Sequence, residues 1–292
     1  MNIFSILKSI VQHPLNKHNK WSAILRFFNW QTNTKLNPYP IIYQFTAKAK
    51  LIVAKGMTGA TGNLYNGLHE YNDMFFLLHF LRPNDLFYDV GANVGSYTVL
   101  ASAHVGATTV AIEPVPAAIA AINNNVAINH TQHLVTVLNA AVGATQGTIQ
   151  FTKSLDTVNH VALATETDVI QVPINTIDAL TINGMPILLK IDVEGYETEV
   201  INGAIQSLSH TQVKAIIIEL NGSGTRYGYN EKLIHTQLLT LGFLPYQYTP
   251  TTRSLLSVTN FGTHNTIYIR DYEFVLQRVQ SAQAITILNQ SI

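Results

Sequence analysis

The sequence predicts an α/β protein built on a doubly wound, mostly parallel sheet of seven strands. Short, continuous apolar runs, such as 187–191 and 215–220, alternate with segments of helical periodicity. Such runs form strands that are buried on both faces, which is the pattern of a parallel sheet covered by helices. A tight turn with Gly91 and Gly95 follows the first run and leads into a helix. Strand, glycine turn and helix in this order are typical of a Rossmann-like fold.

The N-terminal region is expected to form a cap of helices and a hairpin before the sheet begins. Apolar residues recur there at spacings of three and four, the period of an amphipathic helix. Two prolines near residue 40 break this pattern, and several glycines after residue 55 predict a turn. We expect helices over 3–11, 21–30 and 70–81, and strands over 43–53 and 64–65 around the glycine turn.

The remaining segments follow a strand–helix rhythm. Strands are expected over 86–90, 109–112, 135–139, 149–152, 169–173, 187–191, 215–220, 243–248 and 265–269, and helices over 96–104, 116–129, 197–208 and 230–241. One of the last two strands is expected to be antiparallel, because no crossover helix separates them. The rhythm divides the chain into a basic helical and hairpin cap (1–69), a sheet domain (70–271) and a helical tail (272–292).

Composition excludes several classes of protein. Hydrophobic residues make up 47% of the 292 residues, which excludes a charge-driven disordered chain. The sequence has no cysteine, so disulfide scaffolds, cysteine-bound zinc, iron–sulfur clusters and thiol nucleophiles are excluded. The eleven histidines include no H-x-x-x-H pair, and no metal site is expected.

The net charge of zero conceals an asymmetry between segments. Residues 1–69 carry eight basic and no acidic residues, so the other 223 residues carry nine basic and seventeen acidic ones. Such a basic arm suggests an anionic contact. The aromatic residues Trp21, Phe27, Phe28 and Trp30, together with Lys20 and Arg26, resemble a membrane-surface helix, although we favour the alternative that these aromatics pack into the core. Nucleic acid is not an expected partner, because the cations do not form a concentrated stripe.

No apolar run approaches the length of a membrane span. The first residues lack a basic n-region and a small-residue cleavage site, so a signal peptide is not expected. The expected location is therefore cytoplasmic. Peripheral binding of the basic arm (1–69) to the inner face of the membrane is compatible with this expectation. The sequence does not fix an oligomeric state.

The segment LFYDVGANVGSYT (86–98) carries the strongest chemical signal. Its strand ends near Asp89, Gly91 permits a sharp turn, and Gly95 permits close packing as a helix opens near Ser96. Helix N-termini present free N–H groups to an anion. The next strand ends in Glu113, where a carboxylate can accept hydrogen bonds from two ribose hydroxyls. Together these features predict a nucleoside site at the carboxyl edge of the sheet.

The turn favours S-adenosylmethionine among nucleoside ligands. A dinucleotide fingerprint would place glycine where this chain has Asn93. The acidic Asp89 suits an ammonium group, which S-adenosylmethionine has together with a carboxylate and a ribose. A nicotinamide cofactor and a glycine turn without any ligand remain the alternatives. Residues expected to hold the cofactor are Asp89, Gly91, Ala92, Asn93, Gly95, Ser96, Glu113, Asn139 and Asp192.

These motifs resemble those of the FkbM-type methyltransferases, which have the class I methyltransferase fold. The similar stretches are DLFYDVGANVGSYT (85–98), IEPVPAAIAAINNNVAIN (112–129), AAVG (140–143), LLKIDVEGYETEVINGA (188–204), IIIELNGSG (216–224) and NTIYIRD (265–271). The resemblance covers about residues 41–271, while 1–40 match no family that we can name. It implies that 70–271 bind S-adenosylmethionine and methylate hydroxyls of sugars or polyketide-like products.

The block KIDVEGYE lies where the fourth strand meets its helix, beside the predicted switch point of the sheet. Asp192 and Glu194 are expected near the transferred methyl or the acceptor; alternatively, they cap the helix. An alcohol becomes a good nucleophile only when a base takes its proton, and His160 is the candidate histidine. Asp192, Glu194 and His160 are thus the predicted catalytic residues.

Four further polar residues are expected near the acceptor: Asn159, Lys190, Glu219 and Asn221. The predicted function is O-methylation of a hydroxyl, expected on a sugar of a glycan or glycolipid. An N-methyltransferase of an amino sugar and a non-catalytic cofactor-binding module of a biosynthetic complex are the alternatives.

Overall fold

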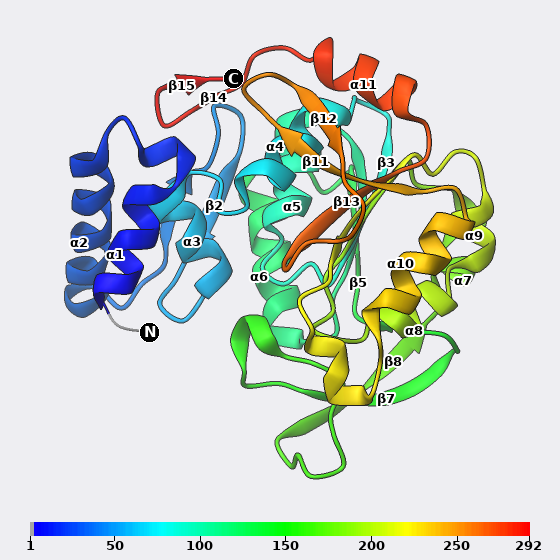
Figure 1. Ribbon diagram of the computed structural model, residues 1–292. Helices are drawn as coiled ribbons and strands as arrows, with labels where there is room; N and C mark the ends of the chain where they lie inside the picture. Colours follow the sequence, from blue (N-terminus) through cyan, green and yellow to red (C-terminus); the bar gives the residue numbers. More distant parts are fainter. Residues whose placement is uncertain (1–2) are drawn as a thin grey trace.

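The computed structural model describes residues 3–292 and centres on a twisted sheet of eight strands (Figure 1). In chain order these are β3 (Leu86–Val90), β4 (Thr108–Ile112), β5 (Val135–Leu138), β9 (Leu188–Ile191), β10 (Ala215–Glu219), β11 (Leu244–Thr249), β12 (Ser254–Ser257) and β13 (Asn265–Ile269). Their order across the sheet is β12-β11-β13-β10-β9-β3-β4-β5. From β3 the sheet extends in one direction through β4 and β5 and in the other direction through β9 and β10, so the strand order reverses at β3.

The sheet is mostly parallel, as predicted. Strands β10, β9, β3, β4 and β5 pair in parallel, whereas β13 lies antiparallel between β10 and β11. The predicted number of seven strands was one too few. The eighth strand, β12, forms an antiparallel hairpin with β11, and only Leu255 of its four residues is buried. An edge strand of this kind lacks the continuous apolar run that marks the central strands.

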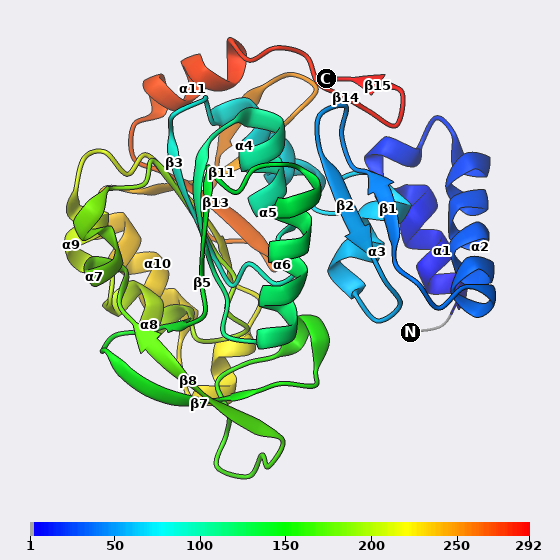
Figure 2. The same cartoon turned by 180° about the vertical axis from the view of Figure 1, so that it is seen from behind.

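Helices cover both faces of this sheet (Figures 1 and 2). On one face lie α4 (Tyr71–Phe80), α5 (Ser96–Val99), its π-helical continuation η2 (Leu100–Val105) and α6 (Pro116–Ile128). On the other lie α7 (Ile177–Leu180), α8 (Glu197–Asn202), α9 (Ile205–Ser209) and α10 (Glu231–Thr240). The helix predicted over 197–208 is therefore two short helices, α8 and α9.

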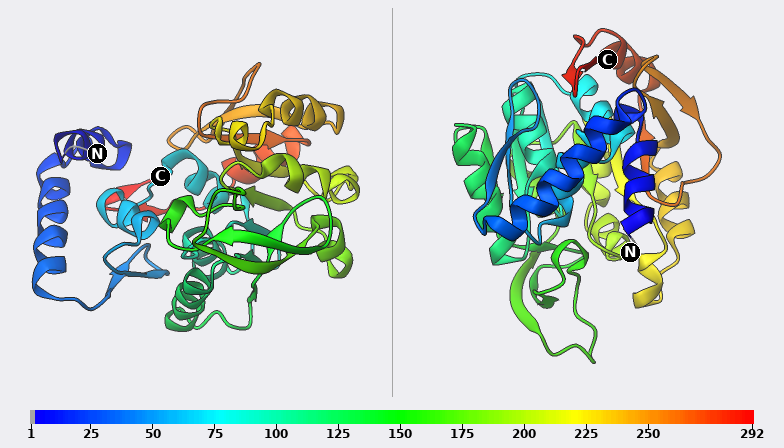
Figure 3. Two further views of the ribbon diagram at one scale, coloured as in Figure 1. Left: turned by 90° about the horizontal axis from the view of Figure 1, so that it is seen from below. Right: turned by 90° about the vertical axis from the view of Figure 1, so that its left-hand side faces the viewer.

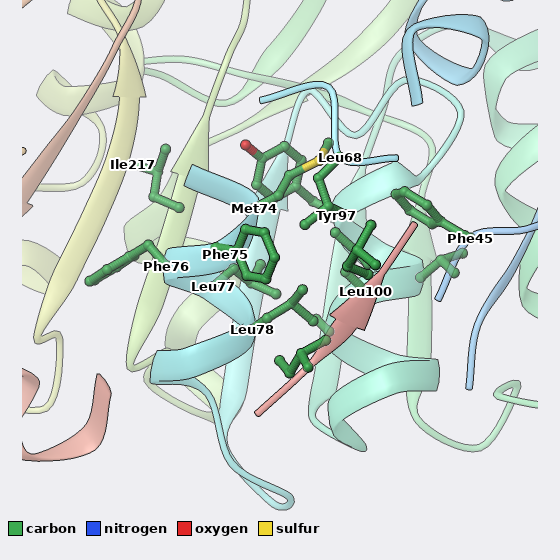
Figure 4. Close-up of a cluster of buried hydrophobic side chains, with 14 of the residues drawn as sticks. Phe45, Leu68, Met74, Phe75, Phe76, Leu77, Leu78, Tyr97, Leu100 and Ile217 are labelled. Atoms are coloured by element: carbon green, nitrogen blue, oxygen red, sulfur yellow. The ribbon is translucent and has the colours of Figure 1, made fainter. Parts of the chain in front are cut away.

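Side-chain alternation along the strands divides the core between the two faces. Ile217 of β10 belongs to the cluster that includes Phe75 and Phe76 of α4 (Figure 4). Its neighbours Ile216 and Ile218 belong to the cluster on the opposite face. Since both faces are buried, the strand needs apolar residues at successive positions, and this explains the continuous run in the sequence.

A second, smaller sheet lies beyond the carboxyl end of β5. It contains β6 (Ala141–Val142), β7 (Gly147–Thr152) and β8 (Val169–Asn175), with β8 in the middle. The long loop 153–168 between β7 and β8 contains one 3₁₀ turn, η3 (Asp156–Val158). The strands predicted over 149–152 and 169–173 are present, but they lie outside the central sheet.

The N-terminal region forms a separate layer beside the sheet domain (Figure 3). It contains α1 (Ile3–Gln12), η1 (Pro14–Asn16), α2 (Lys20–Leu36), β1 (Ile41–Gln44), β2 (Lys50–Val53) and α3 (Thr58–Asn66). Residues 1–2 of the predicted cap lie outside the described residues. The strand predicted over 64–65 is wrong, because Leu64 and Tyr65 belong to the helix α3 and are buried by its packing on α2 and β2.

The C-terminal tail joins the two layers. Helix α11 (Tyr272–Gln280) packs on α4, and the short hairpin of β14 (Thr286–Ile287) and β15 (Gln290–Ser291) follows it. The tail is thus helical only in its first half. The Gln290 side-chain amide donates a hydrogen bond to the Leu15 carbonyl at 2.6 Å. Phe27 and Trp30 of α2 share one apolar cluster with Phe87 of β3, so cap and sheet domain have a continuous core.

Candidate functional site

A cavity of about 260 Å³ lies at the carboxyl ends of the central strands. Its walls include the residues that follow β3, β4 and β9 and the last residue of β10, namely Gly91, Glu113, Asp192 and Glu219. This is the switch point of the sheet, where the loops of neighbouring strands lead in opposite directions and leave a crevice. The topology therefore creates the cavity, and the loops supply its polar groups.

The glycine turn brings two loops into contact. Gly91 has a φ of +80°, and a Cβ atom there would lie 1.8 Å from the carbonyl oxygen of Asp192. No other residue type could fit without moving one of the two strands. Gly95, with a φ of +83°, is the N-cap of α5 and packs close to Ile122 of α6.

Glu113 joins the end of β4 to the glycine turn. One carboxylate oxygen accepts a hydrogen bond from the Asn93 backbone N–H at 2.9 Å, and the other accepts one from the Val115 N–H at 2.9 Å. Burial raises the pKa of Glu113 to about 7. Because a carboxylate offers about four acceptor sites, two remain for a ligand in the cavity.

Charged side chains at the carboxyl ends of β3 and β9 line the cavity beside the turn: Asp89, Lys190 and Asp192. Asp89 accepts a hydrogen bond from the Thr98 hydroxyl at 2.6 Å, and burial raises its pKa. Lys190 donates to Asp192 at 2.7 Å, and its ammonium lies 4.8 Å from the centre of the Tyr97 ring. Burial opposes the charge of Lys190, but the nearby carboxylates outweigh this effect and raise its pKa. Lys190 is thus a cation placed between the carboxylates of Asp89 and Asp192.

Three carboxylates meet in the wall of the cavity: Asp192, Glu194 and Glu219. Their oxygens lie within 4.8 Å of one another, close enough for a shared cation. Burial, reinforced by the charge of Asp192, raises the pKa of Glu194 to about 7 and that of Glu219 to about 8. The sequence spacing did not indicate this cluster, because Glu219 comes from a different strand.

Glu197, which sequence reasoning did not select, holds the loop that carries Glu194. Its buried carboxylate accepts hydrogen bonds from the backbone N–H groups of Val193, at 3.0 Å, and Gly195, at 3.2 Å. Glu194 itself has a φ of +55°, a left-handed conformation that this loop imposes. Glu197 is therefore the residue that caps the loop, and Asp192 and Glu194 face the cavity.

Most of the sequence-predicted site residues come together in the cavity walls. These are Asp89, Gly91, Ala92, Asn93, Ser96, Glu113, Asn159, Lys190, Asp192, Glu194 and Glu219. Among the described residues that line it, four predicted ones are missing: Gly95, Asn139, His160 and Asn221. Gly95 still shapes the turn. The Asn139 amide donates to the carbonyls of Glu113 and Pro114, and the Asn221 side chain accepts from the Ser223 N–H.

His160, a predicted catalytic residue, lies outside the lining of the cavity. The ring is buried outside the cavity lining, with Nδ1 2.7 Å from the Val158 carbonyl and Nε2 3.1 Å from the Glu166 carboxylate. Both nitrogens therefore have local partners, and the ring braces the loop between β7 and β8. The neighbouring Asn159 lines the cavity, although its amide also bonds within this loop.

The cap supplies a wall that the motifs did not indicate. Thr58, Gly59 and Asn63 of α3 line the cavity together with Asp156 of η3. The Thr58 backbone N–H donates to the Asp156 carboxylate at 3.0 Å, and the Asn63 amide donates to the Ser96 hydroxyl at 3.1 Å. Helix α3 and loop 153–168 thus meet over the cavity and cover it.

Glu70 is a further acid that sequence reasoning missed. It lines the cavity and accepts a hydrogen bond from the Asn265 amide at 2.9 Å, while burial raises the pKa of nearby Asp73 to about 7. Neither acid belongs to a recognisable motif. The acidic surplus after residue 69 was the only signal for them in the sequence.

Several solved structures resemble this fold at low identity. They include a precorrin-6y C5,15-methyltransferase from Geobacter metallireducens (14% identity over 70% of this chain and 89% of that chain, TM-score 0.41). Another is a precorrin 8W decarboxylase from Methanobacterium thermoautotrophicum (16% identity over 70% of this chain and 90% of that chain, TM-score 0.40). A third is a SAM-dependent O-methyltransferase from Thermotoga maritima (13% identity over 69% of this chain and 64% of that chain, TM-score 0.36).

Among curated proteins, none has a sequence that matches this chain. The sequence model of the family described as "Methyltransferase FkbM domain" matches residues 89–245, which is more than half of the chain. The matched segment begins at the glycine turn and includes the loops after β3, β4, β9 and β10 that form the cavity. The protein therefore belongs to the FkbM family of S-adenosylmethionine-dependent methyltransferases.

Proposed function

We propose that this methyltransferase transfers a methyl group to a hydroxyl, on a sugar of a glycan or glycolipid. The observation that carries the proposal is the carboxylate cluster of Asp192, Glu194 and Glu219 in the same cavity as the glycine turn. A hydroxyl acceptor needs a base beside the transferred methyl, and the cluster supplies candidate bases on the wall next to that turn.

The residues around the turn fit S-adenosylmethionine. The backbone of the glycine turn lines the cavity at Gly91, and Glu113 keeps acceptor sites for ribose hydroxyls. Asp89 and Asp192 both line the cavity and suit the ammonium group. When bound, the cofactor supplies an electrophilic methyl on a sulfonium. The chain's part is to align the acceptor in line with that methyl and to exclude water.

Glu219 is the base that the arrangement favours. Its pKa is raised to about 8 by burial and by the charges of Asp192 and Glu194, so it binds a proton strongly near neutral pH. A base with a pKa near the working pH combines an adequate ionised fraction with adequate proton affinity. Asp192 is less suited to the role because Lys190 already donates to it at 2.7 Å.

The same cluster also favours a second candidate, N-methylation of an amino sugar. Carboxylate oxygens within 4.8 Å of one another can hold an ammonium, and Glu219 could then take its proton before transfer. The two candidates differ in the acceptor alone. A panel of neutral oligosaccharides and amino sugars, assayed for transfer of radiolabelled methyl, distinguishes them.

The decisive experiment compares Glu219→Gln with Glu273→Gln, a matched change at an exposed acid of α11 outside the cavity lining. Glu219→Gln should lower turnover about 10²–10⁴-fold and leave the affinity for S-adenosylhomocysteine unchanged. Turnover of the native enzyme should rise between pH 7 and 8 as Glu219 loses its proton. Native turnover in Glu219→Gln, or a loss equal to that in Glu273→Gln, would remove Glu219 from the reaction.

Further variants test the remaining assignments. His160→Gln should retain most of its turnover, because the ring lies outside the cavity lining. If the protein binds S-adenosylhomocysteine but methylates no acceptor in the panel, the non-catalytic binding module becomes the better description. If it binds NADH instead, the cofactor assignment is wrong.

A further inference from the structure

Helix α2 exposes an apolar stripe on the side that faces away from the molecule. Trp21 is 78% exposed, Leu25 59%, Phe28 47% and Leu36 80%. These positions follow one another at intervals of four, three and eight residues, so they lie on one face of the helix. The buried residues of α2, which are Ala23, Phe27 and Trp30, lie on the opposite face and pack towards α3.

The stripe lies at the edge of the molecule. Figure 3 shows α1 and α2 as the outermost layer, separated from the central sheet by β2 and α3. Ile3 and Phe4 of α1, the helix packed beside α2, are also largely exposed. A contiguous group of large apolar side chains on a surface marks a contact with a partner or a membrane.

The positive charge of the cap around the apolar stripe favours an anionic partner. Seven lysines of the cap are exposed: Lys8, Lys17, Lys20, Lys35, Lys48, Lys50 and Lys55. None of them forms an ion pair in the described part of the chain, and residues 1–69 contain no acidic residue. Lys20 and Lys35 belong to α2 itself, and Lys17 precedes it by three residues. The positive charge of the cap is therefore free to act on an external anion.

We propose that the cap binds the surface of an anionic phospholipid bilayer, with the apolar stripe of α2 inserted among the lipids and the lysines at the headgroups. A helix with Trp, Phe and Leu on one side and lysines beside them is suited to lie in the plane of a membrane interface. Lysines near such a surface strengthen binding through their attraction to the anionic lipids. The helix lies on the bilayer and does not cross it: no helix within residues 3–292 has the length and apolar content of a membrane span.

A second copy of the chain fits this face less well. In a symmetric dimer the same surface would meet itself, so the unpaired lysines of two caps would face each other. Like charges across an interface oppose association. A bilayer with anionic headgroups supplies the opposite charge over the whole face.

The proposal does not depend on the identity of the acceptor. Helix α3 packs on α2 and also lines the cavity, so it connects the docking face with the cavity. Docking would raise the local concentration of any acceptor carried on a lipid. Vesicle binding without transfer to glycolipids would refute the glycolipid acceptor and leave the docking face intact.

The first test is sedimentation of the full chain with vesicles of phosphatidylcholine, with and without phosphatidylglycerol. The protein should sediment with the anionic vesicles alone, and high salt should release it. The double variant Lys20→Glu/Lys35→Glu should bind at least about tenfold more weakly, whereas Lys232→Glu on α10 should bind as the native protein does. Absence of binding to the anionic vesicles, or equal binding to both vesicle types, would overturn the proposal.

The second test reports insertion of the stripe. The chain has two tryptophans, and only Trp21 is exposed, since Trp30 is buried. Brominated lipids should quench part of the fluorescence on binding, and Trp21→Ser should abolish this quenching. Leu25→Gln/Phe28→Gln should weaken binding at least about tenfold, with Leu233→Gln on α10 as the matched control. A dimer in solution that these substitutions dissociate would identify the face as a homodimer interface and overturn membrane docking.

Discussion

At the scale of single residues, Gly91 lies where the loops after β3 and β9 come into close contact. A side chain at this position would meet the Asp192 carbonyl at 1.8 Å and would also have to adopt a φ of +80°. We expect Gly91→Ala to abolish measurable binding of S-adenosylhomocysteine and to lower the melting temperature. Gly222→Ala is the matched control, since Gly222 has a φ of +91° but open space around its Cβ position.

Comparison of the two variants separates backbone strain from steric collision. The left-handed conformation alone should cost Gly222→Ala about 1–2 kcal/mol of stability and leave ligand binding intact. Calorimetric titration and thermal unfolding of both proteins measure the difference. Equal loss of stability in the two variants, with ligand binding retained in both, would contradict the close approach of the two loops.

A second prediction at this scale concerns Glu113. Its carboxylate holds the Asn93 N–H and keeps acceptor sites open towards the cavity. Glu113→Gln should weaken binding of S-adenosylhomocysteine by about 1.5–3 kcal/mol, roughly 10- to 150-fold, through the loss of charge-assisted bonds. Glu231→Gln, at an acid that accepts the Gly222 N–H away from the cavity lining, is the control. Unchanged affinity in titration calorimetry would show that Glu113 serves only the backbone turn.

The polar residues of the site show how far the sequence could predict individual side chains. Asp89, Gly91 and Glu113 could be found, because their positions after two strands fix where the backbone leaves the sheet. The placements of His160 and Asn221 relative to the cavity could not be found in this way. Local loop geometry gave each a nearby partner, Glu166 for the first and the Ser223 N–H for the second. Spacing in sequence carries no information about such short-range competition.

At the scale of elements, α3 shows how packing overrides local pattern. Its sequence TGATGNLYN has two glycines and little helix propensity, which favoured a turn and a strand. The helix forms where it can bury Leu64 and Tyr65 against α2 and β2. The central strands were predictable for the opposite reason, since burial on both faces leaves an apolar run in the sequence itself.

The contact between α3 and loop 153–168 provides a prediction about this element. Asp156 accepts the Thr58 N–H at the first turn of α3, where a negative charge also suits the helix dipole. Asp156→Asn should weaken the contact by on the order of 0.5–1.5 kcal/mol. The result should be faster hydrogen exchange in loop 153–168 and a higher KM for the acceptor.

Asp168→Asn is the control for this variant, because Asp168 is in the same loop but pairs with exposed Lys153. It should leave both exchange and KM near native values. If Asp156→Asn changes KM without any change in hydrogen exchange, Asp156 contacts the acceptor directly. The proposed role of the contact between α3 and loop 153–168 in covering the cavity would then be wrong.

At the scale of the whole molecule, two groups of buried titratable residues give stability opposite dependences on pH. Burial raises the pKa of Asp73, Glu113, Glu194 and Glu197 to about 7 and that of Glu219 to about 8. These acids keep protons in the folded state that the unfolded chain has already released, so stability falls as pH rises through their folded-state pKa values. Burial lowers the pKa of His13, His79 and His104 to about 4. These histidines make stability fall as pH drops from about 6.5 to 4.

The two effects leave a window in which the acids act alone. Above about pH 7.5 the histidines are largely neutral in both states, so the melting temperature of the ligand-free protein should fall from pH 7.5 to 8.5, mainly as Glu219 loses its proton. Glu219→Gln removes the carboxyl with the highest of these values and should flatten the decline, whereas Glu273→Gln on α11 should leave it unchanged. Thermal unfolding at a series of pH values measures this slope. A melting temperature that rises over the same interval would show that the cavity carboxylates are ionised without penalty in the folded state, and the assignment of Glu219 as a base with a raised pKa would fail with it.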